Sequence, residues 1–402
     1  METKRRRFTI HFYIAAALLA AAYVVLYIVM QQQPLSHSVY DSYTRQAAAW
    51  WQGSAALPEN ISWLEIAEFE GRFFVSFPPF PSVVQFALYP IFGMNTPDNL
   101  VNTLFGLGAF VLVYRVLMKR DLSGFASAVI ALLLVLGSNL FYLSLTGWVW
   151  FSAQVQAFFF SALAVSLILS KRRVAWAFAF LSLGIAFACR PFQIIYLPIM
   201  VYLLYNNCKG ENKPARALLR CVPYLLPLAA VGVLAAAYNF TRFGSIIEFG
   251  HNYLPEFASD AQFSLAYVPG NFLEILKLPY IENGAWQWPK FNGTLFFLVN
   301  PAFVLLVVSM IRQKFGTKQL IYLVCLVAHL VLTLSHKTMG GWQFGARYLV
   351  DMLPFMLLIF TDEPKFKHRP GRAQIVPVLP LALAAVGIAI NVWGAVWFYT
   401  AA

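Results

Sequence analysis

Long apolar runs, separated by short polar or basic segments, set the pattern of this chain. Many of the runs approach the roughly 20 residues that an α-helix needs to cross a bilayer. Segments of regularly alternating apolar and polar residues, which membrane β-barrels require, do not recur. The pattern therefore predicts an all-α polytopic membrane protein with about eleven membrane-spanning helices: 8–30, 99–117, 124–143, 155–169, 174–188, 192–205, 222–238, 295–311, 319–334, 349–360 and 375–397.

The composition agrees with this interpretation and indicates a single membrane domain over residues 1–402. Of the 402 residues, 60% are hydrophobic and 11% are charged, whereas soluble proteins carry about 25% charged residues. The four cysteines form no C-x-x-C motif and no Cys/His metal spacing, so they are predicted to be inert thiols. They are Cys189, Cys208, Cys221 and Cys325.

Charges alternate along the chain in a way that predicts which side of the membrane each loop faces. Basic residues near helix ends stay in the cytoplasm, and the run Lys4 to Arg7 precedes the first apolar segment. We therefore place the N-terminus inside and the C-terminus outside. In this topology the inner segments hold 21 of the 29 Lys and Arg residues and 5 of the 17 Asp and Glu residues. The net charge of +12 thus follows the membrane sides and does not indicate nucleic-acid binding.

Two long segments, 31–97 and 239–294, are predicted to lie outside the cytoplasm. Within the first, residues 79–93 are apolar but short, and prolines bracket them. Counting them as a span would place every later basic cluster outside, against the rule that such clusters stay inside. We therefore predict that the 31–97 segment contains helices that lie along the outer interface.

Asp41 is the one carboxylate just past the first apolar run. It precedes a predicted helix of good helix formers that Gly53 ends. One interpretation is an N-cap, because Asp accepts well from the free amides of a first turn. The other is a general base facing a crevice at the membrane surface, and the two roles are compatible. Glu65, Glu68 and Glu70 follow, either as solvated loop charges or as a second acid.

Cationic residues stand at the predicted outer ends of different helices. An arginine near hydrocarbon is costly without an anionic partner, and its fork of donors suits a phosphate. The alternative is that each side chain extends to lipid headgroups. The candidates for a shared phosphate site are Arg190, Arg347 and Lys337, with Arg72 in the first outer segment.

The order of short motifs along the chain resembles the GT-C superfamily of integral-membrane glycosyltransferases. That group includes protein O-mannosyltransferases and the lipid A aminoarabinose transferase. Each motif is short, and their order and predicted membrane side carry the resemblance. The motifs are Asp41-x-Tyr43 with Gly53, Gly71-Arg72-Phe73-Phe74, Pro78-Pro79 with Phe92-Gly93, Arg190-Pro191, Tyr238-Asn239-x-x-Arg242-Phe243-Gly244, and Gly345-x-Arg347-Tyr348-Leu349.

The resemblance implies a sugar donor linked to a polyprenyl phosphate and a catalytic acid in the first outer loop, which corresponds to Asp41. Family members often have a second acid beside the first, where this chain has Ser42, and another in the next outer loop, where it has none. No metal site and no cofactor are therefore expected, although a divalent metal stays open. Candidates for binding the sugar or the acceptor are Tyr43, His336, Trp342, Glu248 and His251.

These expectations describe a hexosyl- or pentosyltransferase of the cell envelope, placed in the bacterial inner or plasma membrane with its site facing outside. It would move the sugar, with inversion, to a hydroxyl on a glycan, lipid or protein acceptor. A transporter or flippase of a lipid-linked saccharide is the alternative. The apolar runs carry almost no charge, which argues against ion-coupled transport. A non-enzymatic scaffold would leave the long outer segments unexplained.

Overall fold

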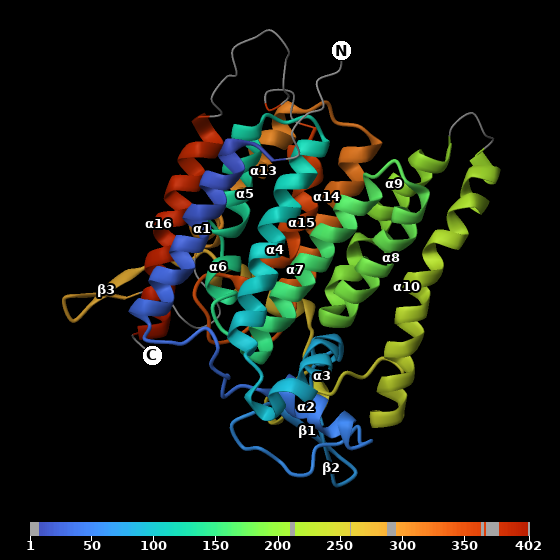
Figure 1. Ribbon diagram of the computed structural model, residues 1–402, viewed down its shortest axis with the longest axis vertical. Coiled ribbons are helices and arrows are strands. Elements are labelled where there is room, and N and C mark those ends of the chain that lie inside the picture. The colour runs from blue at the N-terminus through green and yellow to red at the C-terminus, as the bar shows by residue number, and fades with distance from the viewer. Residues whose placement is uncertain are drawn as a thin grey trace.

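The computed structural model describes residues 8–209, 214–257, 259–287, 295–362, 366 and 378–400. It is a bundle of long helices with smaller helices and one β-hairpin, β1–β2, at one end, and a second hairpin, β3–β4, that projects from its side (Figure 1). Within the described residues, six helices are long and apolar enough to cross a membrane, in agreement with an integral membrane protein. They are α1 (Ile10–Val29), α4 (Asp98–Lys119), α7 (Val149–Ile168), α10 (Pro214–Phe243), α14 (Thr317–Leu334) and α16 (Val378–Thr400).

Several other predicted spans form shorter helices. The shorter apolar helices of 10–17 residues are α5 (Gly124–Val135), α8 (Arg173–Cys189) and α13 (Ala302–Arg312). The run 192–205 begins as the 3-10 helix η2 (Pro191–Tyr196) and continues as α9 (Leu197–Lys209). The run 349–360 likewise begins as η6 (Arg347–Met352) and continues as α15 (Leu353–Phe360). The all-α membrane fold is as predicted, and the count of eleven spans remains a prediction.

The sequence predicted one continuous helix over 124–143, but the structure has a break in this run. Helix α5 ends at Val135, and the short α6 (Leu140–Leu143) follows a turn. In the turn, the backbone N–H of Asn139 donates to Asn300 Oδ1 over 2.9 Å, and Asn300 Nδ2 donates to Asn139 Oδ1 over 2.8 Å. This pair of distant asparagines stabilises a break that local apolarity does not reveal.

The segment 31–97 folds into α2 (Ser42–Trp51), the hairpin β1 (Ile66–Phe69) and β2 (Arg72–Val75), and α3 (Phe80–Phe92). Figure 1 shows these elements together at one end of the bundle, beside the end of α10. Helix α3 has 13 residues, so it is about 20 Å long and too short for the ~30 Å hydrocarbon layer. It packs on α2, where the Trp51 and Phe86 rings stack with centroids 4.7 Å apart.

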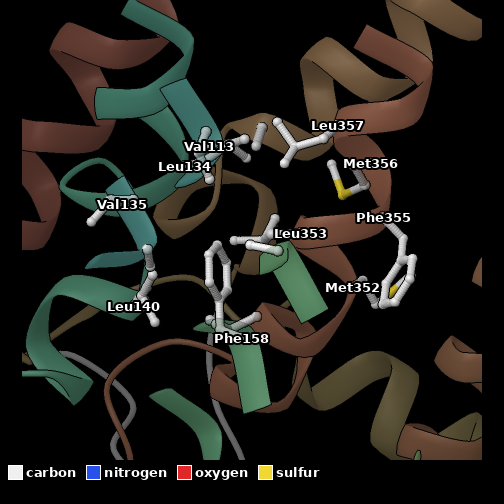
Figure 2. Close-up of a cluster of buried hydrophobic side chains, with 14 of the residues drawn as sticks. Val113, Leu134, Val135, Leu140, Phe158, Met352, Leu353, Phe355, Met356 and Leu357 are labelled. Carbon is white, nitrogen blue, oxygen red and sulfur yellow. The ribbon is translucent and has the colours of Figure 1, made fainter. Parts of the chain in front are cut away.

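The core of the bundle lies where α4, α5, α7 and α15 meet. Figure 2 shows Val113, Leu134, Phe158 and Leu353, one from each of these helices, in a single buried cluster. Every residue of α15 is buried, so this short helix runs through the middle of the protein. Further short elements lie between α10 and α13 in the chain: η3 (His251–Tyr253), η4 (Pro255–Phe257), η5 (Leu265–Tyr267), α11 (Val268–Glu274), β3 (Tyr280–Glu282), β4 (Ala285–Gln287) and α12 (Phe296–Val299).

Candidate active site

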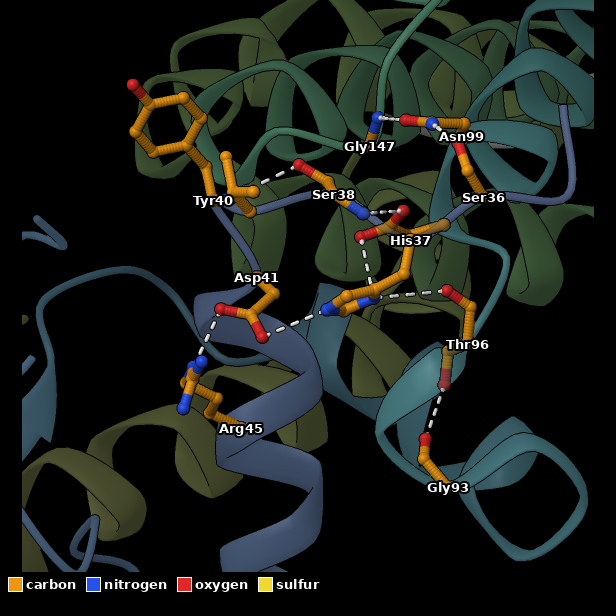
Figure 3. A network of polar contacts seen from close by, with 12 residues as sticks. Ser36, His37, Ser38, Tyr40, Asp41, Arg45, Gly93, Thr96, Asn99 and Gly147 are labelled. Carbon is orange, nitrogen blue, oxygen red and sulfur yellow. Dashed lines mark hydrogen bonds and ion pairs between the residues drawn. The ribbon is translucent and has the colours of Figure 1, made fainter. Parts of the chain in front are cut away.

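Asp41 stands at the N-cap position of α2, as the sequence predicted, but its carboxylate does not cap the helix. Instead, Arg45 Nε donates to Asp41 Oδ1 over 2.7 Å, and His37 Nε2 lies 3.0 Å from Asp41 Oδ2 (Figure 3). Residues 41 and 45 meet because side chains four apart share one face of a helix. Asp41 is buried, with 3% of the residue exposed, so its two neighbours determine its environment.

Asp98, at the start of α4, is a second buried acid beside Asp41, and sequence reasoning missed it. Its Oδ1 accepts the backbone N–H of Ser38 over 2.9 Å, and its Oδ2 lies 3.7 Å from His37 Nδ1. His37 therefore lies between the two carboxylates, and Figure 3 shows its ring beside Asp41 and Thr96. An acid that directly follows Pro97 and begins an apolar run was the available signal.

A second group of charges forms where Arg190, at the end of α8, meets η6. Arg190 Nε and Nη2 lie 3.0 and 2.9 Å from Asp351 Oδ2. The Tyr348 ring lies under two guanidinium groups, with its centroid 4.3 Å from Arg190 Cζ and 4.8 Å from Arg347 Cζ. Arg190 and Arg347 are thus close to each other, as expected, because both contact Tyr348. Asp351, which pairs with Arg190, is fully buried.

Arg347 is buried and its hydrogen-bond partners are uncharged. Its Nη1 donates to Gln154 Oε1 over 2.7 Å and its Nη2 to the Gly340 carbonyl over 2.8 Å. Within the described residues its Nε has no hydrogen-bond partner, and no carboxylate forms an ion pair with it. A buried arginine with a spare donor and only neutral partners is suited to an anionic ligand.

We predict that Gly340→Ala lowers stability by about 1–3 kcal/mol, the usual cost of a strained backbone. Gly340 has φ +100°, and a Cβ there would lie 3.0 Å from the Tyr348 ring and 3.1 Å from Arg347 Nε. Gly284→Ala is the control, since that glycine has φ +73° but nothing within 4 Å of an added Cβ. Thermal unfolding of both variants in detergent tests this, and an equal loss in both would show that the Arg347 contact does not matter.

The first turns of helix α7 contact both charged clusters: the 31–97 segment that carries Asp41, and the cluster of Arg190, Arg347 and Asp351. Trp150 Nε1 donates to Glu65 Oε1 over 2.9 Å, and Gln154, four residues later on the same face, holds Arg347. The backbone N–H of Val149 donates to the Tyr40 carbonyl over 3.1 Å, which attaches the start of α7 to the residue before Asp41. Glu65 and Asp41 are thus fixed to the helix that positions Arg347.

Tyr43 and Glu65 face this region from the 31–97 segment. Burial raises the pKa of the Tyr43 hydroxyl well above its usual value, and the charges of Arg190 and Glu65 act on it in opposite directions. The Tyr43 hydroxyl is buried without a hydrogen-bond partner within the described residues. Burial also raises the pKa of the Glu65 carboxyl to about 7. Glu65 is therefore a second candidate acid that the sequence left open among three glutamates.

We expect Glu65 to contribute stability that is lost as pH rises from about 4.5 to about 7, so the native protein should lose stability across this window relative to Glu65→Gln. The folded protein keeps the Glu65 proton up to about pH 7 because its pKa is raised there by burial, whereas the unfolded chain releases it earlier. Unfolding therefore releases a proton in this window, and stability declines across it. Thermal unfolding of Glu65→Gln should show a smaller decline, while Glu68→Gln, at an exposed site, should match the native protein.

Two of the predicted histidines also belong to this neighbourhood. Burial lowers the pKa of His336 to about 3, and His251, Arg190 and Arg347 act in the same direction. Burial and Arg190 likewise lower the pKa of His251 to about 4. Both imidazoles are therefore neutral near pH 7, where they can donate and accept hydrogen bonds but add no charge. The His336 ring stands edge-on to Tyr348, with centroids 5.7 Å apart.

The other predicted site residues lie in different settings. Lys337 Nζ donates to the Glu256 carbonyl over 2.7 Å and to Asp260 Oδ2 over 2.8 Å. Arg72 is exposed on β2, with its guanidinium 5.1 Å from the Phe74 ring centroid. Glu248 binds the backbone N–H of Gly250 and the side chain of Asn252 in its own loop. Trp342 is 53% exposed. The contacts of Lys337, Arg72 and Glu248 described here do not reach Arg347 or Asp41.

The Tyr238-Asn239-x-x-Arg242 motif holds the 31–97 segment on α10. Arg242 is buried, and its Nη1 and Nη2 donate over 2.8 Å to the Val75 carbonyl and to Asn239 Oδ1. The Tyr238 hydroxyl accepts from Gln46 and Trp50 of α2 over 2.9 and 3.1 Å. The motif therefore has a structural role here, because it fixes both α2 and β2 to one helix end.

Within the part of the chain that the structure describes, no group of three or more His, Cys, Asp or Glu side chains is arranged to hold a metal ion. No protein-family model matches the sequence, and no curated protein matches it. Solved structures do match the fold.

One similar structure is that of ArnT from Cupriavidus metallidurans bound to undecaprenyl phosphate, with a TM-score of 0.53 and 16% sequence identity. The match covers 86% of this chain and 59% of that one, so this chain spans less than two thirds of its length. A second is the oligosaccharyltransferase AglB from Archaeoglobus fulgidus in complex with an inhibitory peptide and a dolichol-phosphate. There the TM-score is 0.48 at 12% identity, over 97% of this chain and 56% of that one. ArnT is a GT-C membrane glycosyltransferase, and this chain shares its fold, as the order of the motifs suggests.

Proposed function

We propose that this protein is a membrane glycosyltransferase that moves a sugar from a polyprenyl-phosphate donor to an acceptor hydroxyl, with inversion. The observation that carries the proposal is Arg347. Within the described residues this buried arginine has only uncharged hydrogen-bond partners, and its Nε has no hydrogen-bond partner. It lies in one neighbourhood with the acid Glu65 and with Tyr43 of α2, two residues after Asp41. ArnT, which shares the fold, is bound to undecaprenyl phosphate in its own structure.

The reaction needs one group that accepts a proton and one that stabilises a leaving phosphate. Asp41 would take the proton of the acceptor hydroxyl while the hydroxyl oxygen attacks the anomeric carbon. The bond between that carbon and the phosphate oxygen breaks, and its electron pair leaves with the lipid phosphate. Attack from the face opposite the leaving group inverts the configuration. Phosphate is a good leaving group, so the protein need not supply an acid.

Arg347 would stabilise the negative charge that grows on the phosphate. Arg190, which contacts the same Tyr348 ring, would add a second positive charge nearby. Fixed donors in a buried site stabilise such charge without having to reorganise during the reaction. Arg190 is already balanced by Asp351, so Arg347 has the larger spare capacity. The neutral imidazoles of His336 and His251, together with the Tyr43 hydroxyl, would bind sugar or acceptor hydroxyls as uncharged donors and acceptors.

A nearby apolar groove has a suitable position for the isoprenoid chain of the donor. It runs along α14 beside Leu323, Val327 and Val331, with Leu265 from η5, and reaches Ser335. Ser335 directly precedes His336, so the groove ends next to the proposed phosphate site. A saturated or isoprenoid chain in such a groove would be bound by apolar contact alone.

The test uses purified protein in detergent micelles with a polyprenyl-phosphate donor that carries a radiolabelled sugar. A transferase moves the label to an acceptor and releases the lipid phosphate, whereas a flippase leaves the glycosyl bond intact. Label that stays on the lipid with every donor and acceptor, combined with donor translocation in vesicles, would favour the transporter.

A further inference from the structure

A proton taken up by Asp41 has one polar route away from the site among the described residues. The Asp41 side chain is 2% exposed, so bulk water has little direct access to it. Its Oδ1 accepts from Arg45 Nε, and a guanidinium does not give up or exchange its charge near neutral pH. Its Oδ2 faces His37 Nε2 at 3.0 Å. The His37 side chain is 23% exposed, and thus reaches solvent more readily than Asp41 does.

The surroundings of His37 fix which of its ring nitrogens carries the permanent hydrogen. Its Nδ1 lies 3.3 Å from the Thr96 carbonyl oxygen, which can only accept a hydrogen bond, and 3.7 Å from Asp98 Oδ2. Nδ1 must therefore be protonated to satisfy both neighbours. Nε2, which faces Asp41, is then the nitrogen that gains and loses a proton (Figure 3).

We propose that His37 accepts the proton that Asp41 takes up and then releases it to water. This positioning and proton-accepting role rests on the proposed function. In the structure both ring nitrogens face acceptors, so His37 is an imidazolium that donates from Nε2 to the Asp41 carboxylate. It becomes the active form by releasing the Nε2 proton to water, which leaves a neutral ring with its hydrogen on Nδ1. The acceptor hydroxyl gives its proton to Asp41, which passes it from Oδ2 to His37 Nε2. The products at this point are an imidazolium and a regenerated carboxylate, so charge and protons balance. The imidazolium then releases the proton to water.

The charged groups around His37 favour this sequence. Asp41 and Asp98 face the ring from α2 and α4, and Arg45, which pairs with Asp41, is the cation on the same side. The hydrogen bond to Asp41 raises the pKa of His37 above its usual value; burial opposes this, and Asp98 adds to it. The imidazolium that forms after proton transfer is thus stabilised by two carboxylates, while turnover requires the neutral ring. Activity should therefore rise with pH through the pKa of His37.

The test compares the pH profiles of sugar transfer for the native protein and His37→Gln. Glutamine can still donate a hydrogen bond toward Asp41 but cannot take up a proton. We expect kcat to fall by about 10–100-fold, less than the roughly 10²–10⁴-fold contributed by a group that acts on the substrate directly, and the acid limb of the profile to disappear. The control variant Ser36→Ala, next to His37 in the chain, should retain the native kcat and the acid limb of the pH profile. An unchanged profile in His37→Gln, or a uniform fall in kcat with the acid limb retained, would overturn the role.

A measurement independent of transfer separates this inference from the proposed function. Histidine ¹⁵N NMR of the full-length protein in nanodiscs should show His37 with a protonated Nδ1, and Asp41→Asn should lower its pKa. A neutral ring protonated on Nε2, or a pKa that Asp41→Asn does not change, would overturn the inference even if transfer occurs. Absence of transfer in the native protein would overturn the proposed function and the catalytic role of His37, and the NMR result would still report whether the two groups share a proton.

Discussion

Replacing Asp41 by asparagine is expected to lower kcat for sugar transfer by about 10²–10⁴-fold, the usual contribution of a general base. Asparagine has nearly the same shape, and its carbonyl can still accept from Arg45 Nε, which is 2.7 Å from Asp41 Oδ1 in the native protein. It cannot take a proton from a hydroxyl at neutral pH. The KM for the donor should change less, because the phosphate is assigned to Arg347. Initial rates with a labelled donor in micelles measure both quantities.

Two variants make the Asp41 result interpretable. Glu282→Gln removes an exposed acid on β3 and should leave the rate unchanged. Glu65→Gln tests the competing acid, whose burial raises its pKa to about 7 and so suits it to proton transfer near neutral pH. Near-normal turnover in Asp41→Asn with a large loss in Glu65→Gln would reject Asp41 as the base and transfer that role to Glu65.

Replacing Arg347 by methionine is expected to lower kcat by about 10²–10³-fold, as removal of a fixed donor at a developing anion does. The physical reason is that its guanidinium carries a full charge and is buried, and that within the described residues it donates hydrogen bonds only to Gln154 and to the Gly340 carbonyl. Arg347→Lys keeps the charge but loses the planar fork, so it should recover only part of the rate. Transfer rates and binding of undecaprenyl phosphate to each variant, followed in detergent, provide the measurement.

Arg190 gives a contrasting control for Arg347. Arg190→Met leaves the fully buried Asp351 without its partner, and breaking a buried ion pair in this way costs about 3–5 kcal/mol. Its main effect should therefore be on stability, and the double variant Arg190→Met/Asp351→Asn should recover much of the lost stability. If Arg347→Met instead unfolds the protein like Arg190→Met, while Arg347→Lys keeps full activity and full lipid binding, Arg347 is a structural residue and the phosphate site lies elsewhere.

The sequence by itself determined the helical class and most long elements of this protein. Apolar runs of about 20 residues predict α1, α4, α14 and α16 within a few residues, because the need to satisfy backbone groups in hydrocarbon is local to each run. The start of α2 just after Asp41 was also predictable, because the strong helix formers Ala47 to Ala49 follow it and Gly53 ends the run. The order of the GT-C motifs pointed to the fold that this chain shares with ArnT.

Only the tertiary structure decided which charges meet. Arg190 and Asp351 are 161 residues apart in the chain, and nothing near either residue predicts the pair. The break after α5 depends on Asn139 and Asn300 in the same way. Whether a carboxylate is solvated, paired or buried depends on what other segments bring to it, as Asp98 and Glu65 show. Hydropathy is a property of each run, whereas a charged site is a property of the contacts between runs, which form only when the chain folds.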